Sequence, residues 1–157
     1  MRKLTVGGMI ESKGLTLIRV MGVPDRPGIA GKLFRHLATL RVNVEFISSA
    51  TDLLGTANLI LCVNSEAGSR LEDELEGLRA CVDAGRVDSL GDVATIGVYG
   101  PHFRETPDVA AQLFSCLAEK EIQVLGVSTS ISTVACLVRG SELQSARDAI
   151  CCVFALP

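Results

Sequence analysis

Two copies of one pattern decide the fold: LTLIRVMGVPDRPGIAGKLFRHLATLRVNVEFISS at residues 15–49 and VATIGVYGPHFRETPDVAAQLFSCLAEKEIQVLGVST at residues 93–129. From Pro27 and Pro107 onward the copies align without a gap at a constant offset of 80. A period near 80 residues is too long for a solenoid repeat and has the size of a small domain. The chain is therefore predicted to be a duplicated module. The identical pairs in the gapless stretch are Leu33-Phe34/Leu113-Phe114, Leu37-Ala38/Leu117-Ala118, Val44/Val124 and Ser48/Ser128.

Composition narrows the functional classes. A net charge of −3 gives no electrostatic basis for nucleic-acid binding, which needs a basic face. No apolar run approaches the ~20 residues that span a bilayer. The start MRKLTVGGMIESKG is interrupted by charge and glycine before a signal-peptide core forms. We expect a cytoplasmic protein, and the Met1 start favours a complete product over a fragment of a larger enzyme.

The cysteines and histidines indicate no metal or cofactor. None of the six cysteines forms a C-x-x-C motif, and His36 and His102 have no ligand spacing with them. Free cysteines in a reducing compartment behave as small apolar residues. No catalytic constellation is present, so the chain is predicted to be non-enzymatic and to use no cofactor.

The first copy predicts a β-α-β-β-α-β order. An amphipathic helix begins at Pro27-Gly28, after a β-rich run and a VPDRPG turn. A hairpin, a second helix and a weak strand follow. This order is the split βαβ arrangement of ferredoxin-like folds. The expected strands are 15–22, 42–49, 56–63 and 86–90, and the second helix carries Leu71, Leu75, Leu78 and Val82.

The second copy lacks a last strand of its own. Its expected elements are strand 93–99, helix 107–120, strands 122–130 and 133–138, and helix 141–155. An unpaired sheet edge is a liability, and the run KLTVGGMI at 3–10 is unassigned. We therefore predict an α+β protein of two modules with antiparallel sheets and helices on one face. The first module is 15–91, and the second is 1–14 plus 92–157, with the N-terminal strand donated to it.

The string GVPDRPGIAGKLFRHLATLRVNVEFI resembles the effector loop and first helix of an ACT domain. The whole chain resembles the tandem ACT regulatory region of aspartokinases, since HFRETPDVAAQLFSCLAEKEIQVLGVSTS repeats the pattern and VGGMIESKGLTLIRV resembles its lead-in. The aspartokinase catalytic domain has no counterpart here. The resemblance implies a non-catalytic homodimer that binds an amino-acid effector at a module interface. It also implies allosteric control of amino-acid metabolism, with a catalytic enzyme as possible partner.

The turn before the first helix has the chemistry of an amino-acid site. Unpaired N–H groups at a helix N-terminus suit a carboxylate, and Gly28 leaves them approachable. Asp25 is placed to meet an ammonium group. An ordinary solvated turn also explains PDRPG, with Asp for capping and Pro-Gly for turn geometry. The candidate residues in this copy are Asp25, Pro27, Gly28, Ile29 and Ala30, with Asn43, Val44 and Glu45 expected close by.

Other positions qualify this site. Ser49 and Ala50 stand where aspartokinase regulatory regions commonly carry Gln-Asn, so the effector's identity is open. In the second copy, Asp108 stands at the position of Gly28, and its carboxylate would repel that of a ligand. Leu125 stands where aspartokinase regulatory regions often carry an acidic residue, so one partner for a ligand's ammonium group is absent. We therefore expect the first copy to hold the main site. Ser128 and Thr129 either hydrogen-bond a ligand across an interface or satisfy backbone groups at their strand end.

Two alternatives from other classes remain open. A ferredoxin-like acyl phosphatase would need an Arg in a phosphate-cradling loop with a nearby Asn, for which Arg26 and Asn43 are the nearest candidates. A structural assembly module without ligand would show no response to amino acids.

Overall fold

A computed structural model describes residues 2–101 and 103–157 and shows two compact units. The first unit is Gly14–Gly91. The second combines Met1–Lys13 with Asp92–Pro157. Two long strands, β2 (Gly8–Pro24) and β5 (Arg86–Tyr99), each contribute one end to each unit.

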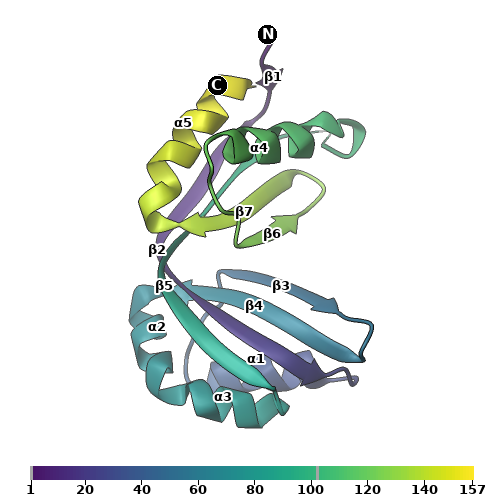
Figure 1. The fold of residues 1–157 in the computed structure, drawn as a ribbon, viewed down its shortest axis with the longest axis vertical. Coiled ribbons are helices and arrows are strands. Elements are labelled where there is room, and N and C mark those ends of the chain that lie inside the picture. Colours follow the sequence, from purple (N-terminus) through teal and green to yellow (C-terminus); the bar gives the residue numbers. More distant parts are fainter. Residues whose placement is uncertain (1, 102) are drawn as a thin grey trace. The chain divides into compact units, whose positions relative to one another are not determined.

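The first unit is a four-stranded sheet covered on one face by helices (Figure 1). Its strand order is β3-β4-β2-β5, and β4 is antiparallel to both of its neighbours. This arrangement agrees with the ferredoxin-like fold predicted from the sequence. Besides β2 and β5, the elements are α1 (Ile29–Thr39), β3 (Phe46–Thr51), β4 (Thr56–Asn64), α2 (Ser65–Leu71), a 3₁₀ turn (Glu72–Glu74) and α3 (Leu75–Val82).

Alternation along the strands builds the core of this unit. Ile18 and Val20 of β2 point to the helix-covered face, where Leu33 and Leu37 of α1 and Leu78 of α3 meet them. All five side chains are buried. The helices and strands therefore fix the loop between β2 and α1 from both sides.

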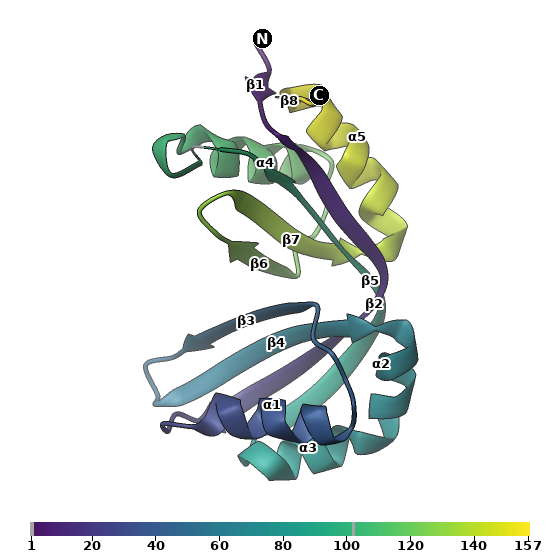
Figure 2. The same cartoon turned by 180° about the vertical axis from the view of Figure 1, so that it is seen from behind.

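The second unit repeats this plan with the order β2-β5-β7-β6. Its helices are likewise on one face (Figure 2). The elements are a 3₁₀ turn (Phe103–Glu105), α4 (Asp108–Glu119), β6 (Gly126–Thr129), β7 (Thr133–Arg139), a 3₁₀ turn (Gly140–Glu142), α5 (Leu143–Val153) and β8 (Phe154–Ala155).

The predicted donation of the N-terminal strand is confirmed. The start of β2 lies beside β5 as the fourth strand of the second unit, and Val6 is buried in that unit's core. Glu11 on β2 forms an ion pair with Arg147 on α5. The donated segment is held by backbone, apolar and ionic contacts together.

The prediction of a single strand at 3–10 was wrong, because the N-terminal segment changes its pairing partner after Val6. The short strand β1 (Leu4–Thr5) pairs in parallel with β8, and the Val6 N–H donates to the Ala155 carbonyl at 3.2 Å. The next N–H, of Gly7, donates instead to the Tyr99 carbonyl of β5 at 2.7 Å. The N-terminal segment is thus bonded first to β8, at the end of the chain, and then to β5.

Other expectations about elements were also wrong. The strand expected at 122–130 is limited to β6, and the helix expected at 141–155 ends at Val153, before β8. Strands 86–90 and 93–99 are one strand, with Asp92 in the left-handed region at φ 50°. The second helix of the first unit is two helices separated by a 3₁₀ turn. Residues 42–45 are outside β3, because the Val42 N–H donates to Leu37 at the end of α1 and only Glu45 reaches β4.

Within residues 2–101 and 103–157, no helix is long and apolar enough to cross a bilayer. The same described residues contain no group of three or more His, Cys, Asp or Glu side chains that would hold a metal ion.

The N-terminal segment gives a test of this architecture. Val6→Asp should lower the free energy of unfolding of the second unit by at least about 2 kcal/mol, because an unpaired charge would be placed in an apolar core. Thr5→Asp is the matched control, since Thr5 is exposed. Hydrogen exchange should accelerate in residues 92–157 for Val6→Asp alone. Unchanged exchange there would contradict the donated strand.

Candidate functional site

The loop between β2 and α1 is shaped by an irregularity in β2. The register with β4 shifts between Val20 and Val23, and Gly22 is in the left-handed region at φ 67°. The Gly22 N–H donates to the Asn58 side-chain oxygen at 2.9 Å. On the other side, the Gly85 N–H donates to the Met21 carbonyl at 3.0 Å. The start of the loop is therefore tied both to β4 and to the chain that follows α3.

The loop enters α1 through Gly28, whose φ of 88° is a conformation that non-glycine residues rarely adopt. No side chain caps this helix. The Ile29 N–H donates to the Arg26 carbonyl at 3.3 Å, whereas the first-turn N–H groups of Ala30 and Gly31 have no backbone acceptor among the described residues. Such free N–H groups, with the positive end of the helix dipole, favour an anion.

Asp25, in the β2–α1 loop, contacts the tip of the hairpin that joins β3 and β4. The Asp25 backbone N–H donates to the Gly55 carbonyl at 3.1 Å, and Asp25 is an exposed residue. The tip is ordered by Asp52, which accepts from the N–H groups of Leu54 at 2.7 Å and Thr56 at 3.1 Å, and from the Thr56 hydroxyl. These bonds hold the pKa of Asp52 below its ordinary value of 3.8, the Thr56 hydroxyl contributing most.

A cavity of about 500 Å³ opens on the other side of the loop, between α1 and α3. The two helices lie side by side on one face of the sheet (Figure 2). From the α1 side it is lined by 26–29, Lys32 and Arg35, and from the α3 side by 80–83. Pro27, Gly28 and Ile29 thus border this cavity, whereas Asp25 and Ala30 do not.

The prediction that Asn43, Val44 and Glu45 lie close to the β2–α1 loop was wrong for a single chain. These residues lie at the opposite end of the sheet from the loop. The Glu45 N–H donates to Cys62 on β4, whereas Pro24, at the start of the loop, is paired with Thr56. Cys62 and Thr56 are six residues apart on β4, which corresponds to about 20 Å along the strand. The reason is the β-α-β connection, because α1 returns the chain to the end where β2 began.

The remaining predicted positions lie on strands. Ser49 is exposed on β3, paired with Leu59, on the half of the strand nearer the loop. Ser128 and Thr129 are on β6 of the second unit, paired with Ala135 and Val134. The adjoining Ser130 hydroxyl accepts from the Ser132 N–H at 3.4 Å, and this bond satisfies a backbone group at the strand end.

The matching loop of the second unit has a different backbone. Pro107, at φ −61°, precedes α4 in place of a left-handed glycine, and Asp108 is an exposed acidic residue in the first turn. A fixed carboxylate there disfavours a second anion at the same N-terminus. Leu125, opposite Leu137 through its N–H, is half-buried. His102 lies outside the described residues.

Comparison with known families agrees with the two units. Residues 16–83 match a family described as ACT domain, and residues 96–154 match a second family of the same description. The chain belongs to the ACT-domain family. The first ACT domain is thus carried by the first unit and the second ACT domain by the second unit.

Curated relatives are aspartokinases. The chain is 31% identical over 150 residues to aspartokinase of Bacillus sp. strain MGA3, covering 95% of this chain and 36% of that protein. It is 26% identical over 154 residues to aspartokinase of Corynebacterium efficiens, covering 96% and 36%. The chain spans about a third of the length of the curated relatives that it matches.

Solved structures with this fold include regulatory subunits. The regulatory subunit of aspartate kinase from Thermus thermophilus, in its ligand-free form, superposes with a TM-score of 0.84 at 23% identity, covering 96% of this chain and 99% of that one. A chain in a structure of aspartokinase alpha and beta subunits gives 0.81 at 26% identity, covering 92% and 95%. The tandem ACT fold of this chain is therefore that of aspartokinase regulatory regions.

The residue pair proposed for acyl phosphatase chemistry does not come together. Arg26 lies in the loop that follows Pro24, and Asn43 precedes β3 at the other end of the sheet. An acyl phosphatase needs both side chains on the same phosphate, so Arg26 and Asn43 cannot form such a site within one chain.

The α3 wall of the cavity was missed from sequence. Ala80–Asp83 are about fifty positions from the loop. The signal that predicted α3 was its apolar face, and a helix face in a ferredoxin-like unit packs against its neighbour helix. Asp83 ends α3 in the left-handed region at φ 54°, where its N–H donates to Ala80.

The hairpin tip gives a prediction about pH. Because the folded pKa of Asp52 is lowered, its bonds stabilise the tip fully above pH 3.8 and are lost as the pH falls through the folded pKa. Thr56→Val should raise the Asp52 pKa toward 3.8 and loosen the tip at higher pH, since it removes the largest cause. Carboxylate NMR titration measures this, and Thr51→Val, which keeps those bonds, is the control. An unshifted Asp52 titration in Thr56→Val would refute the assignment.

Proposed function

We propose that the chain is a non-catalytic regulatory module that binds a small amino acid at the β2–α1 loop of its first ACT domain. The binding would control an enzyme of amino-acid metabolism. The observation that carries the proposal is the Gly28 turn, which leaves first-turn N–H groups of α1 free beside an exposed carboxylate on Asp25. An α-amino acid presents the complementary pair, a carboxylate and an ammonium group.

The relatives support a regulatory role. The Thermus thermophilus regulatory subunit is matched over 99% of its length, so a protein of this extent serves as a separate subunit there. Aspartokinase III of E. coli, which shares the fold at 16% identity, has been solved with lysine and aspartate in a T-state. By analogy, we propose an amino-acid effector and an aspartokinase-type catalytic partner for this chain.

The second cluster of candidate residues favours a site shared between two copies of the chain. Asn43, Val44 and Glu45 are too far from the loop to meet the same ligand within one copy. β3 is an edge strand, and an edge strand is a template for pairing with another chain. Antiparallel pairing of β3 with its symmetry mate would place the loop of one copy near 43–45 of the other.

Exposed apolar side chains of the first ACT domain are available to the same dimer. Ile47 on β3 is 38% exposed and Phe34 on α1 is 37% exposed. Ile47 alternates onto the helix-covered side of β3, since its partner on β4 is the core residue Leu61. Burying two such side chains from each copy is a favourable hydrophobic contribution to association.

The amino-acid site is tested by a thermal-shift screen against the twenty amino acids at millimolar concentration. One of them should raise the melting temperature, because a ligand at ~100 times its Kd stabilises the folded state by ~2.7 kcal/mol. Asp25→Ala should remove most of that shift, since it deletes the proposed partner of the ammonium group. The side chain is exposed, so the substitution leaves the core unchanged.

Asp73→Ala is the matched control, because Asp73 is an exposed carboxylate of the same unit away from the loop. An equal shift in wild type and Asp25→Ala would place the effector elsewhere. A flat response to all twenty amino acids would instead favour a structural assembly module.

The dimer is tested at its edge. Ile47→Lys should convert the dimer to a monomer in sedimentation-velocity runs, because it sets two charges against each other across the two-fold axis. Ile131→Lys is the control, since Ile131 is 67% exposed in the β6–β7 hairpin of the second ACT domain. A wild-type monomer, or a dimer that survives Ile47→Lys, would rule out this interface.

A further inference from the structure

The cavity between α1 and α3 presents a charge pattern that the amino-acid site does not use. Arg26, Lys32 and Arg35 line it, and Asp83 is the one carboxylate among the lining residues. The lining thus carries an excess of two positive charges. Its volume of about 500 Å³ is in the usual range of small-molecule sites.

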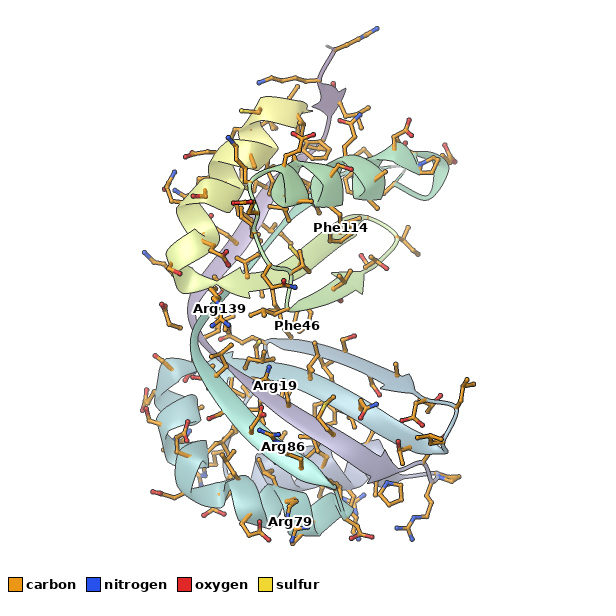
Figure 3. The ribbon with its side chains drawn as sticks, viewed as in Figure 1. Arg19, Phe46, Arg79, Arg86, Phe114 and Arg139 are labelled. Atoms are coloured by element: carbon orange, nitrogen blue, oxygen red, sulfur yellow. The ribbon has the colours of Figure 1, made fainter. Side chains whose placement is uncertain are left out.

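These three cations have no ion-pair partner in the described part of the chain. Three other arginines of the same unit, Arg19, Arg79 and Arg86, are ion-paired, whereas Arg70 donates to a backbone carbonyl. Arg79 on α3 bonds Glu76 at 2.6 Å, and Arg19 bonds Asp88 at 2.6 Å (Figure 3). Three cations against the single carboxylate of Asp83 leave an excess of positive charge, so an anion in the cavity would stabilise the arrangement.

The duplication supplies an internal comparison. The positions of Lys32 and Arg35 on α1 correspond to Gln112 and Ser115 on α4, and the residue before the shared proline is Thr106 in place of Arg26. The buried positions are kept, as Leu33 and Leu113 show. The fold therefore needs the apolar face of this helix but not its cations, which belong to the first ACT domain alone.

We propose that the α1–α3 cavity binds a phosphate-bearing anion, at a site that shares Pro27, Gly28 and Ile29 with the effector loop but does not include Asp25. A phosphate monoester carries about −1.5 to −2 charges at pH 7, which matches the excess charge of the lining. Arginine presents a planar fork of donors that fits phosphate oxygens, and lysine adds a point charge. A single carboxylate would leave at least one cation of the cavity without a counter-charge.

Cys81 provides a local reporter of occupancy. It lines the cavity, and its Sγ lies 3.8 Å from the Lys32 carbonyl oxygen. Cys151 and Cys152 are exposed, so both are replaced by Ser in the reporter protein. Cys62, Cys116 and Cys136 are buried, and burial raises their pKa to about 12, 11 and 12, which suppresses thiolate chemistry.

The experiment uses inorganic pyrophosphate as probe. Titration calorimetry should show binding that weakens in 0.5 M salt, because exposed charges are screened. Pyrophosphate should also slow maleimide labelling of Cys81. Arg35→Gln should weaken binding about tenfold by removing charge-assisted hydrogen bonds, whereas Asp83→Asn should tighten it by removing a repulsive carboxylate. Asn also accepts the left-handed conformation of position 83.

Lys120→Gln, an exposed cation at the end of α4, is the matched control and should leave binding unchanged. Absence of pyrophosphate binding, equal binding in Arg35→Gln, or weaker binding in Asp83→Asn would overturn the proposal. Malonate, a dicarboxylate with about the charge of inorganic phosphate at pH 7, should bind more weakly than inorganic phosphate. Tighter binding of malonate than of inorganic phosphate would overturn the assignment to phosphate. Asp25→Ala should bind pyrophosphate like the wild type, because Asp25 does not line the cavity, so failure of the amino-acid site is distinguishable from failure of the phosphate site.

Discussion

The fold depends on two strands that are each shared between two sheets. β2 and β5 run without interruption from one ACT domain into the other, and each supplies a strand to both. In the second ACT domain, β8 follows α5 but pairs with β1 in a separate two-stranded sheet, so the fourth strand beside β5 is supplied by the N-terminal part of β2. The first domain is therefore a continuous segment, Gly14–Gly91, inserted between the two parts of the second domain.

This sharing positions the candidate site through the far end of β2. In the first ACT domain, β2 continues to the irregularity at Gly22, and the bonds to Asn58 and Gly85 fix where the loop leaves the sheet. Gly28 then turns the chain into α1 with its first N–H groups free. The second ACT domain reaches its helix through Pro107 and Asp108, so duplication kept the core but not the backbone chemistry at the helix N-terminus.

The sequence predicted the repeated helices of the two copies and the donation of the N-terminal strand to the second copy. The constant offset of 80 located both helices, and the absent last strand of the second copy pointed to the N-terminal segment. It did not predict that Asn43–Glu45 lie away from the loop, although the β-α-β order already requires the chain to return to the other end of the sheet. The cavity wall at Ala80–Asp83 could not be read from local pattern, because it exists through the packing of α3 against α1.

A site divided between two copies would couple ligand binding to assembly. If the loop of one copy and residues 43–45 of the other both contact the effector, the dimer binds it more tightly than the monomer does, and the effector stabilises the dimer by the same factor. Regulation requires such a difference, because a ligand with equal affinity for two states shifts neither. The edge strand β3, which carries the exposed Ile47, is the element through which that difference in affinity would arise.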